Sequence, residues 1–111
     1  METIIMAKKT ILKIKGKEGH SEYYDGYKYN DFLGLALMGD TWQAVHIPTG
    51  CVIVGKDAKF KRKRSCLKYV EMLEHLDFDI QNTEELYAKN GGKESIWKAY
   101  DIAYNEGVKL E

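Results

Sequence analysis

The sequence predicts one α+β domain, a small, mainly antiparallel sheet from the N-terminal half packed by two or three helices from the C-terminal half. Three observations predict this fold. Residues 10–54 contain short β-branched and aromatic runs between turn residues, residues 65–105 place apolar side chains at helical spacing, and strands and helices are grouped along the chain rather than alternating. The chain of 111 residues suffices for one core, so residues 1–111 are expected to form a single domain.

The first expected strand covers residues 10–16, with a start as early as Ile4, and ends at the glycines that follow it. Four tyrosines then surround Asp25-Gly26 in residues 21–30. Asp-Gly between aromatic residues is typical of hairpin turns, so we expect the chain to reverse there.

Residues 32–38, Phe-Leu-Gly-Leu-Ala-Leu-Met, fit two structures. Leucine, alanine and methionine favour a helix, with Asn30 or Asp31 as its cap. A buried strand fits equally well, because a short apolar run has no decisive period. Gly39-Asp40 then predicts a turn.

The clearest element is a hairpin of residues 42–47 and 51–54 around Pro48-Thr49-Gly50. Proline presets φ and Gly50 accepts the left-handed conformation that closes a three-residue loop. Because both faces of this hairpin are largely apolar, we expect the sheet to be covered on both sides, with the tyrosines as one cover. In this register, alternate side chains of the hairpin share a face. One face carries Val45, Ile47, Cys51 and Ile53. The other face carries Trp42, Ala44, His46, Val52 and Val54.

The first helix is expected at residues 65–76, where an apolar stripe runs through Cys66, Val70 and Leu73. Further along, Asn82 and Glu85 resemble a capping box that opens a short helix ending at residues 90–92. Residues 95–105 predict the last helix.

Residues 56–68 carry seven Lys and Arg against the single acid Asp57. The densest part, residues 61–64, lies at or before the start of the first helix. The helix dipole favours anions at that end, so the basic side chains are expected to be solvated or to have an anion nearby.

Net charge is zero, but the charges are segregated along the chain. Residues 1–70 carry 13 Lys and Arg and 7 Asp and Glu, a balance of +6, whereas residues 71–111 carry 4 and 10, a balance of −6. This pattern indicates either a molecule with a basic end and an acidic end, or two halves that attract each other within the fold.

Candidate catalytic and metal-binding groups do not form a known pattern. The two cysteines fit no zinc spacing, the acids near residues 77–85 do not form a calcium loop, and no glycine loop cradles phosphate. We therefore expect no catalytic residue, no metal and no cofactor, and His46 is expected to fill a sheet position or make a structural hydrogen bond. Cys51 and Cys66 are interpreted as buried, reduced thiols of a cytoplasmic protein without a signal peptide or membrane span.

At Trp42-x-x-Val45-His46-x-x-Thr49-Gly50, followed by a strand and a basic helix start, the chain resembles small proteins encoded by phages and other bacterial mobile elements. Their pattern is a Trp-Val-x-His-x-x-Thr-Gly hairpin that leads into a helix, and here Gln43-Ala44 intervenes. The resemblance covers residues 42–76. It implies a small cytoplasmic accessory protein that binds a host or phage protein, and no catalytic residue carries over.

The sequence therefore predicts a non-enzymatic protein that binds an acidic surface of another protein, such as a nucleic-acid-handling or defence enzyme. The alternatives are a nucleic-acid-binding module that uses residues 56–68, a small enzyme with a Cys or His centre, and a homodimer. The expected contacts are basic side chains and an apolar anchor: Lys59, Lys61, Arg62, Lys63 and Arg64, with Trp42 and His46.

Overall fold

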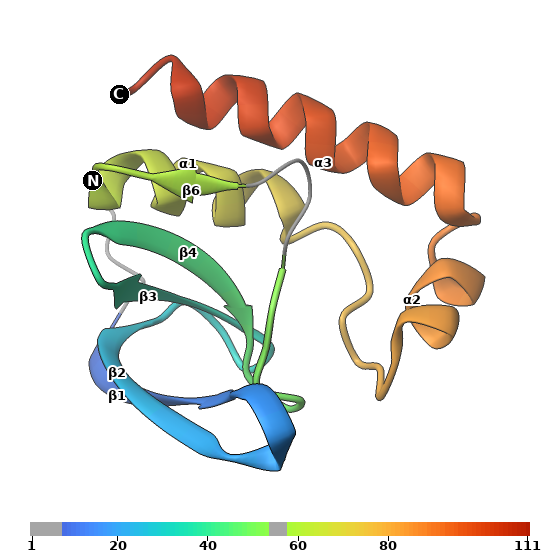
Figure 1. Ribbon diagram of the computed structural model, residues 1–111. Coiled ribbons are helices and arrows are strands. Elements are labelled where there is room, and N and C mark those ends of the chain that lie inside the picture. Colours follow the sequence, from blue (N-terminus) through green and yellow to red (C-terminus); the bar gives the residue numbers. More distant parts are fainter. Residues whose placement is uncertain (1–7, 54–57) are drawn as a thin grey trace.

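The computed structural model describes residues 8–53 and 58–111, and it has a curled antiparallel sheet followed by three helices (Figure 1). The predicted α+β class is therefore confirmed. The helices are α1 (Lys63–Leu73), α2 (Thr83–Lys89) and α3 (Lys93–Val108), and a short 3-10 turn, Lys17–Gly19, joins the first two strands. The strands are β1 (Lys8–Lys15), β2 (Ser21–Lys28), β3 (Leu33–Met38), β4 (Thr41–His46), β5 (Cys51–Val52) and β6 (Lys59–Phe60).

The strands pair in the order β1-β2-β3-β4-β5, and β6 also pairs with β4. The sheet curls until β1 meets the turn before β5, where the Lys15 N–H donates a 2.8 Å hydrogen bond to the Gly50 carbonyl. The concave face of the curl encloses a small apolar cluster of Leu12, Ile14, Ala36 and Val45.

The main core lies on the other face of the sheet, under α1 and α3 (Figure 1). Leu35 and Ala44 contribute from the sheet, and the fully buried Tyr69 contributes from α1. The expected coverage of both faces is confirmed, but the sheet's own curl and the helices form the two covers. Of the tyrosines, Tyr24 packs on the concave cluster while Tyr27 packs on the main core.

The expected reversal at Asp25-Gly26 is wrong, because both residues lie inside β2. Gly26 is needed for close packing between strands rather than for a turn. A Cβ atom at this position would lie 2.3 Å from the Leu35 carbonyl oxygen and 3.0 Å from the Ala36 Cα. The missing side chain therefore lets β2 and β3 approach within the curl.

The reversal occurs instead at Asn30, and residues 33–38 form the strand β3. The Asn30 side-chain oxygen accepts hydrogen bonds from the N–H groups of Phe32 and Leu33, at 2.9 and 2.8 Å. A helix cap would use the same oxygen in the same way, so the local chemistry of Asn30 fits both structures.

The predicted hairpin between β4 and β5 is present, but its register is shifted by one residue. His46 pairs with Cys51 and Val45 pairs with Val52, so residues 47–50 form the loop. The Gly50 N–H bonds to the His46 carbonyl at 2.8 Å, and Gly50 has the expected positive φ of 72°. As a result, Val52 shares the face of Val45, and Ile53 lies on the opposite face. Val54 is outside the described residues.

The three helices follow the predicted segments with different ends. The start of α2 is capped as predicted, since the Glu85 N–H donates to the Asn82 side chain at 2.9 Å. Gly91 and Gly92 then separate α2 from α3 with φ values of 85° and 102°. Near the end of α3, a Cβ on Gly107 would lie 2.8 Å from the Phe60 ring and from the Ser65 carbonyl, so this glycine allows close packing.

Candidate functional site

The predicted basic segment spans β6 and the start of α1, and its Lys and Arg side chains between residues 59 and 64 form no ion pair with another described residue. Lys59, Lys61, Arg62, Lys63 and Arg64 are all exposed. Within residues 8–53 and 58–111, none of the five forms an ion pair, whereas Lys68 of the same segment pairs with Glu71 at 3.3 Å. The expected partner residues therefore retain charge for another molecule, and Lys56 and Asp57 lie outside the described residues.

A carboxylate, that of Glu111, lies at the start of α1, where an anion was expected near the basic side chains. The Glu111 carboxylate accepts hydrogen bonds from the backbone N–H groups of Lys61 and Arg62, at 2.8 and 3.1 Å. The Arg64 guanidinium donates to the Leu110 carbonyl at 3.0 Å. Both parts of the expectation are therefore met, because the side chains are solvated and an anion occupies the helix end.

The pKa of Glu111 reflects this environment. Burial raises its pKa, but the backbone hydrogen bonds from Lys61 and Arg62, the nearby Ser65 hydroxyl and the Arg62 charge outweigh burial and lower the pKa below its usual 4.5. Glu111 therefore remains a carboxylate at neutral pH. Its single negative charge neutralises part of a segment with five cations.

An aromatic pair extends the basic segment onto the sheet. The Lys63 ammonium lies 4.2 Å from the centre of the Tyr27 ring, and the Tyr27 and Trp42 ring centres are 6.1 Å apart. Lys9 is directly opposite Tyr27 in the ladder, so the two side chains share a face. Both aromatic side chains are half-buried, which leaves part of each ring accessible between cations.

These residues form one surface at the end of the molecule where α1 begins, on the left of Figure 1. Register and ring contacts connect its parts, because Lys8 pairs with Lys28 and Lys63 covers Tyr27. We call this surface the basic end. Its members are exposed cations from β1, β2, β6, the two residues after β6, and α1: Lys8, Lys9, Lys28, Lys59, Lys61, Arg62, Lys63 and Arg64.

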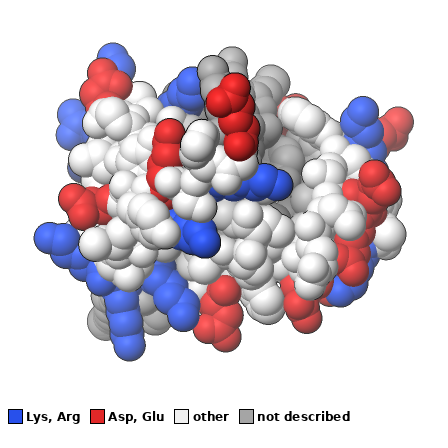
Figure 2. All heavy atoms as spheres, turned by 60° about the horizontal axis from the view of Figure 1, so that its bottom comes forward, with Lys and Arg blue, Asp and Glu red and all other residues white. Residues whose placement is uncertain are grey.

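Acidic side chains gather at the opposite end, around α2. Figure 2 shows one face of the molecule, with several acidic side chains on its right-hand side, where α2 lies in Figure 1. Asp77, Asp79, Glu84 and Glu94 are exposed in this region. We call this region the acidic end. It also carries Lys89 and Lys93, and Lys28 of the basic end pairs with Asp31, so the fold retains the charge segregation of the sequence in part.

The expected apolar anchor is divided between two environments. Trp42 is half-buried beside Tyr27, within reach of the basic end. His46 is only 4% exposed, so its ring offers almost no surface to a partner. Its Nδ1 lies 2.7 Å from the Thr49 hydroxyl and its Nε2 lies 2.7 Å from the Phe78 carbonyl.

His46 has a structural role in this arrangement. Because a carbonyl only accepts hydrogen bonds, Nε2 carries a proton and donates it to Phe78, while Nδ1 and the Thr49 hydroxyl share the second hydrogen bond. The Thr49 oxygen in turn accepts from the Cys51 N–H at 3.3 Å. The network joins the hairpin to the segment after α1, and Phe78 lies 32 positions from His46, which sequence spacing does not reveal.

The remaining candidates for chemistry are dispersed. The expectation of two buried cysteines is wrong for Cys51, which is exposed beside the hairpin turn. Cys66 is buried in α1 as expected, and burial raises the pKa of its thiol. The described residues contain no group of three or more His, Cys, Asp or Glu side chains that could hold a metal ion. Among the described helices, none combines the length and apolar character needed to cross a membrane.

No protein-family model, curated protein or solved structure matches this chain. Its function is therefore inferred from the arrangement of its own residues.

Proposed function

We propose that this protein is a non-enzymatic accessory protein of phage or mobile-element type that binds an acidic surface of another protein through its basic end. One observation carries the proposal. Lys61, Arg62, Lys63 and Arg64 are consecutive and exposed, and none forms an ion pair with a described carboxylate. Such charges steer an oppositely charged partner and orient it on contact.

The half-buried aromatic pair supports a protein partner. Tyr27 and Trp42 provide rigid apolar area beside the cations of the basic end. Protein interfaces combine such an aromatic centre with a polar rim. The acidic end also disfavours long polyanions, because a nucleic acid that extends past the basic end meets Asp77, Asp79 and Glu84. A compact acidic patch avoids this repulsion.

A nucleic-acid-binding function is the second candidate, and the surroundings of Tyr27 favour it. Exposed cations beside an aromatic pair are typical of surfaces that bind single strands, and a base that displaced Lys63 from the Tyr27 ring could stack in its place. The cations would contact phosphates, so affinity would fall steeply with salt.

Charge removal at the basic end tests the proposal. The variant replaces Lys61, Arg62, Lys63 and Arg64 with glutamine. The matched control removes the same number of exposed charges elsewhere, by replacing Lys13, Lys15, Lys93 and Lys98. Both proteins are used to capture partners from lysate of the native host, and the affinity of any captured protein is then measured after purification.

The expected result is one captured protein that the control retains and the basic-end variant loses, with affinity reduced about tenfold or more. A partner that binds both variants equally contradicts the proposal. Titration with labelled single-stranded and duplex oligonucleotides, from low to high salt, tests the second candidate. Tight binding that weakens steeply with salt would favour nucleic acid, and no binding at low salt would exclude it.

A further inference from the structure

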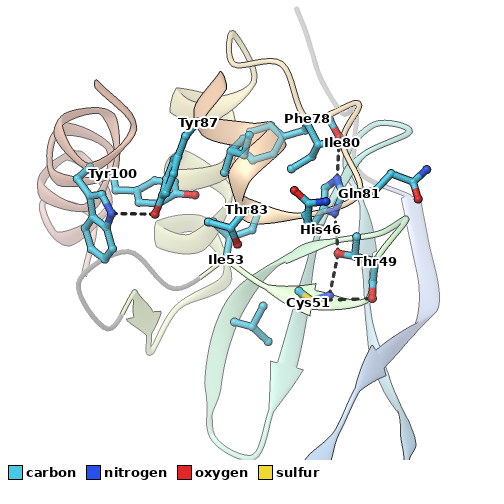
Figure 3. Close-up of a pocket in the computed structure, with 14 residues that line it drawn as sticks. His46, Thr49, Cys51, Ile53, Phe78, Ile80, Gln81, Thr83, Tyr87 and Tyr100 are labelled. Carbon is cyan, nitrogen blue, oxygen red and sulfur yellow. Dashed lines mark hydrogen bonds between the residues drawn. The ribbon is translucent and has the colours of Figure 1, made fainter. Parts of the chain in front are cut away.

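A cavity of about 300 Å³ lies between β5, α2, α3 and the segment that joins α1 to α2, away from the basic end (Figure 3). We propose that this cavity binds a small, neutral, largely apolar molecule that carries a hydrogen-bond acceptor. The volume is at the lower end of the range for ligand cavities, so the ligand is expected to be no larger than a compact ring system with short substituents.

The walls of the cavity are apolar over most of their area. Ile53 contributes from the end of the hairpin, Phe78 and Ile80 from the segment before α2, and Leu86 from α2. Each of these side chains is buried in the protein, with at most 8% of its surface exposed. An apolar ligand body would be removed from water by contact with them.

Tyr100 supplies the polar group that points to a ligand. Its side chain reaches the cavity from α3 and is only 7% exposed (Figure 3). Within the described residues its hydroxyl forms no hydrogen bond, and because it opens onto the cavity it is free to bind a ligand. Burial, followed by the nearby Tyr87, raises the pKa of Tyr100 to about 12. The hydroxyl therefore keeps its proton at neutral pH and is available as a donor.

Tyr87 places a second hydroxyl at the same wall of the cavity (Figure 3). Its oxygen accepts a hydrogen bond from the Trp97 indole N–H at 3.3 Å, so its own proton remains available to donate. Two phenolic donors at one wall select a ligand oxygen or nitrogen with lone pairs, such as a carbonyl group.

The other polar groups explain why the ligand should be neutral. The lining contains no Lys, Arg, Asp or Glu among the described residues, so no charge would compensate a buried ion. His46 has both nitrogens engaged by Thr49 and Phe78, and the Asn82 oxygen accepts from Glu85. Gln81 and Thr83 also line the cavity, and because their side chains are neutral they cannot compensate the charge of an ion.

Two-dimensional ¹H–¹⁵N NMR provides a test with an internal control. Trp97 lines the cavity and Trp42 lies beside Tyr27 at the basic end, so the protein has one indole N–H signal at each place. The probes are acetophenone, which carries an acceptor, ethylbenzene, which has the same shape without one, and benzoate, which adds a charge. We expect acetophenone to shift the Trp97 signal saturably and leave the Trp42 signal unchanged.

The Tyr100→Phe variant separates the hydroxyl from the apolar wall, and Tyr104→Phe on the same helix is the matched control. Loss of one hydrogen bond should weaken acetophenone binding by about fivefold in Tyr100→Phe and leave ethylbenzene binding unchanged. In the wild type, acetophenone should bind more tightly than either ethylbenzene or benzoate.

Three results would overturn the inference. The first is an unmoved Trp97 signal up to the solubility limit of acetophenone. The second is equal affinity for acetophenone and ethylbenzene in the wild type, and the third is tighter binding of benzoate. None of these results bears on the basic end, because partner capture by that surface is measured separately.

Discussion

The Glu111 carboxylate accepts a 2.8 Å hydrogen bond from the backbone N–H of Lys61, and the two residues are 50 positions apart. This contact brings the end of the chain to the start of α1, in the middle of the strongest cationic segment. It provides the helix end with the negative charge that residues 61–64 lack. The basic end is therefore the proposed surface for a partner and also the place where Glu111 contacts the start of α1.

Replacing Glu111 with glutamine should destabilise the protein by about 0.5–1 kcal/mol at pH 7, because α1 loses the charge at its start. The measurement is urea unfolding, and Asp40→Asn, in an exposed turn, is the control.

The effect of Glu111 should also depend on pH. Its pKa is lowered in the folded protein, so the carboxylate stabilises the fold above its usual value of 4.5 and loses this effect as pH falls through the lower folded pKa. Wild type and Glu111→Gln should therefore converge in stability in strong acid. A difference between them that persists there would show that the hydrogen-bond geometry, not the charge, is responsible.

Replacing His46 with phenylalanine should reduce the free energy of unfolding by about 1–3 kcal/mol, because the Phe78 carbonyl loses its donor in a buried site. His20→Ala, at an exposed position, should change stability by less than about 0.5 kcal/mol. Denaturant unfolding monitored by circular dichroism measures both. Equal stability of His46→Phe and the wild type would remove the structural role assigned to this ring.

Replacing Gly26 with alanine should destabilise the curl by about 1–3 kcal/mol, since the added methyl group has no room beside the Leu35 carbonyl. Thr10→Ala is the matched control, because Thr10 is exposed and pairs with Gly26 across β1 and β2. Thermal unfolding should show a lower midpoint for Gly26→Ala alone. A midpoint equal to that of the wild type would mean that the strands can separate at this position without loss.

The two cysteines should differ in reactivity. Cys51 is exposed and should react with a thiol reagent such as DTNB in the native protein. Cys66 should react only after unfolding, because it is buried and burial raises its pKa. The released chromophore should correspond to one thiol before denaturant and two after. Cys51→Ser should abolish the native signal, and a native signal that persists in this variant would place Cys66 at the surface.

The sequence predicted correctly those features whose interacting residues are close together in the chain. Asn82 and Glu85 are three positions apart and cap α2 as expected, and the stripe through Cys66, Val70 and Leu73 is buried in α1. In each case the partners lie within one or two turns of the same helix. Spacing in the sequence therefore reports their spacing in the structure.

Long-range partners were not predictable in the same way. His46 bonds to Phe78, 32 positions away, and the loop after His46 is one residue longer than expected, which reverses the faces of β5. The charge of Lys61–Arg64 indicated that an anion was needed, but ten acids in residues 71–111 could supply it. Only the fold identifies Glu111. The cavity was missed because its walls come from segments that the sequence separates.

The first strand has a consequence for self-association. Among the described strands, β1 pairs only with β2, so its other edge carries backbone groups outside the ladder apart from the contact with Gly50. Half of its eight residues are lysines, and all four are exposed. A second copy aligned along this edge would bring like charges together, so these lysines act as gatekeepers against edge-to-edge aggregation.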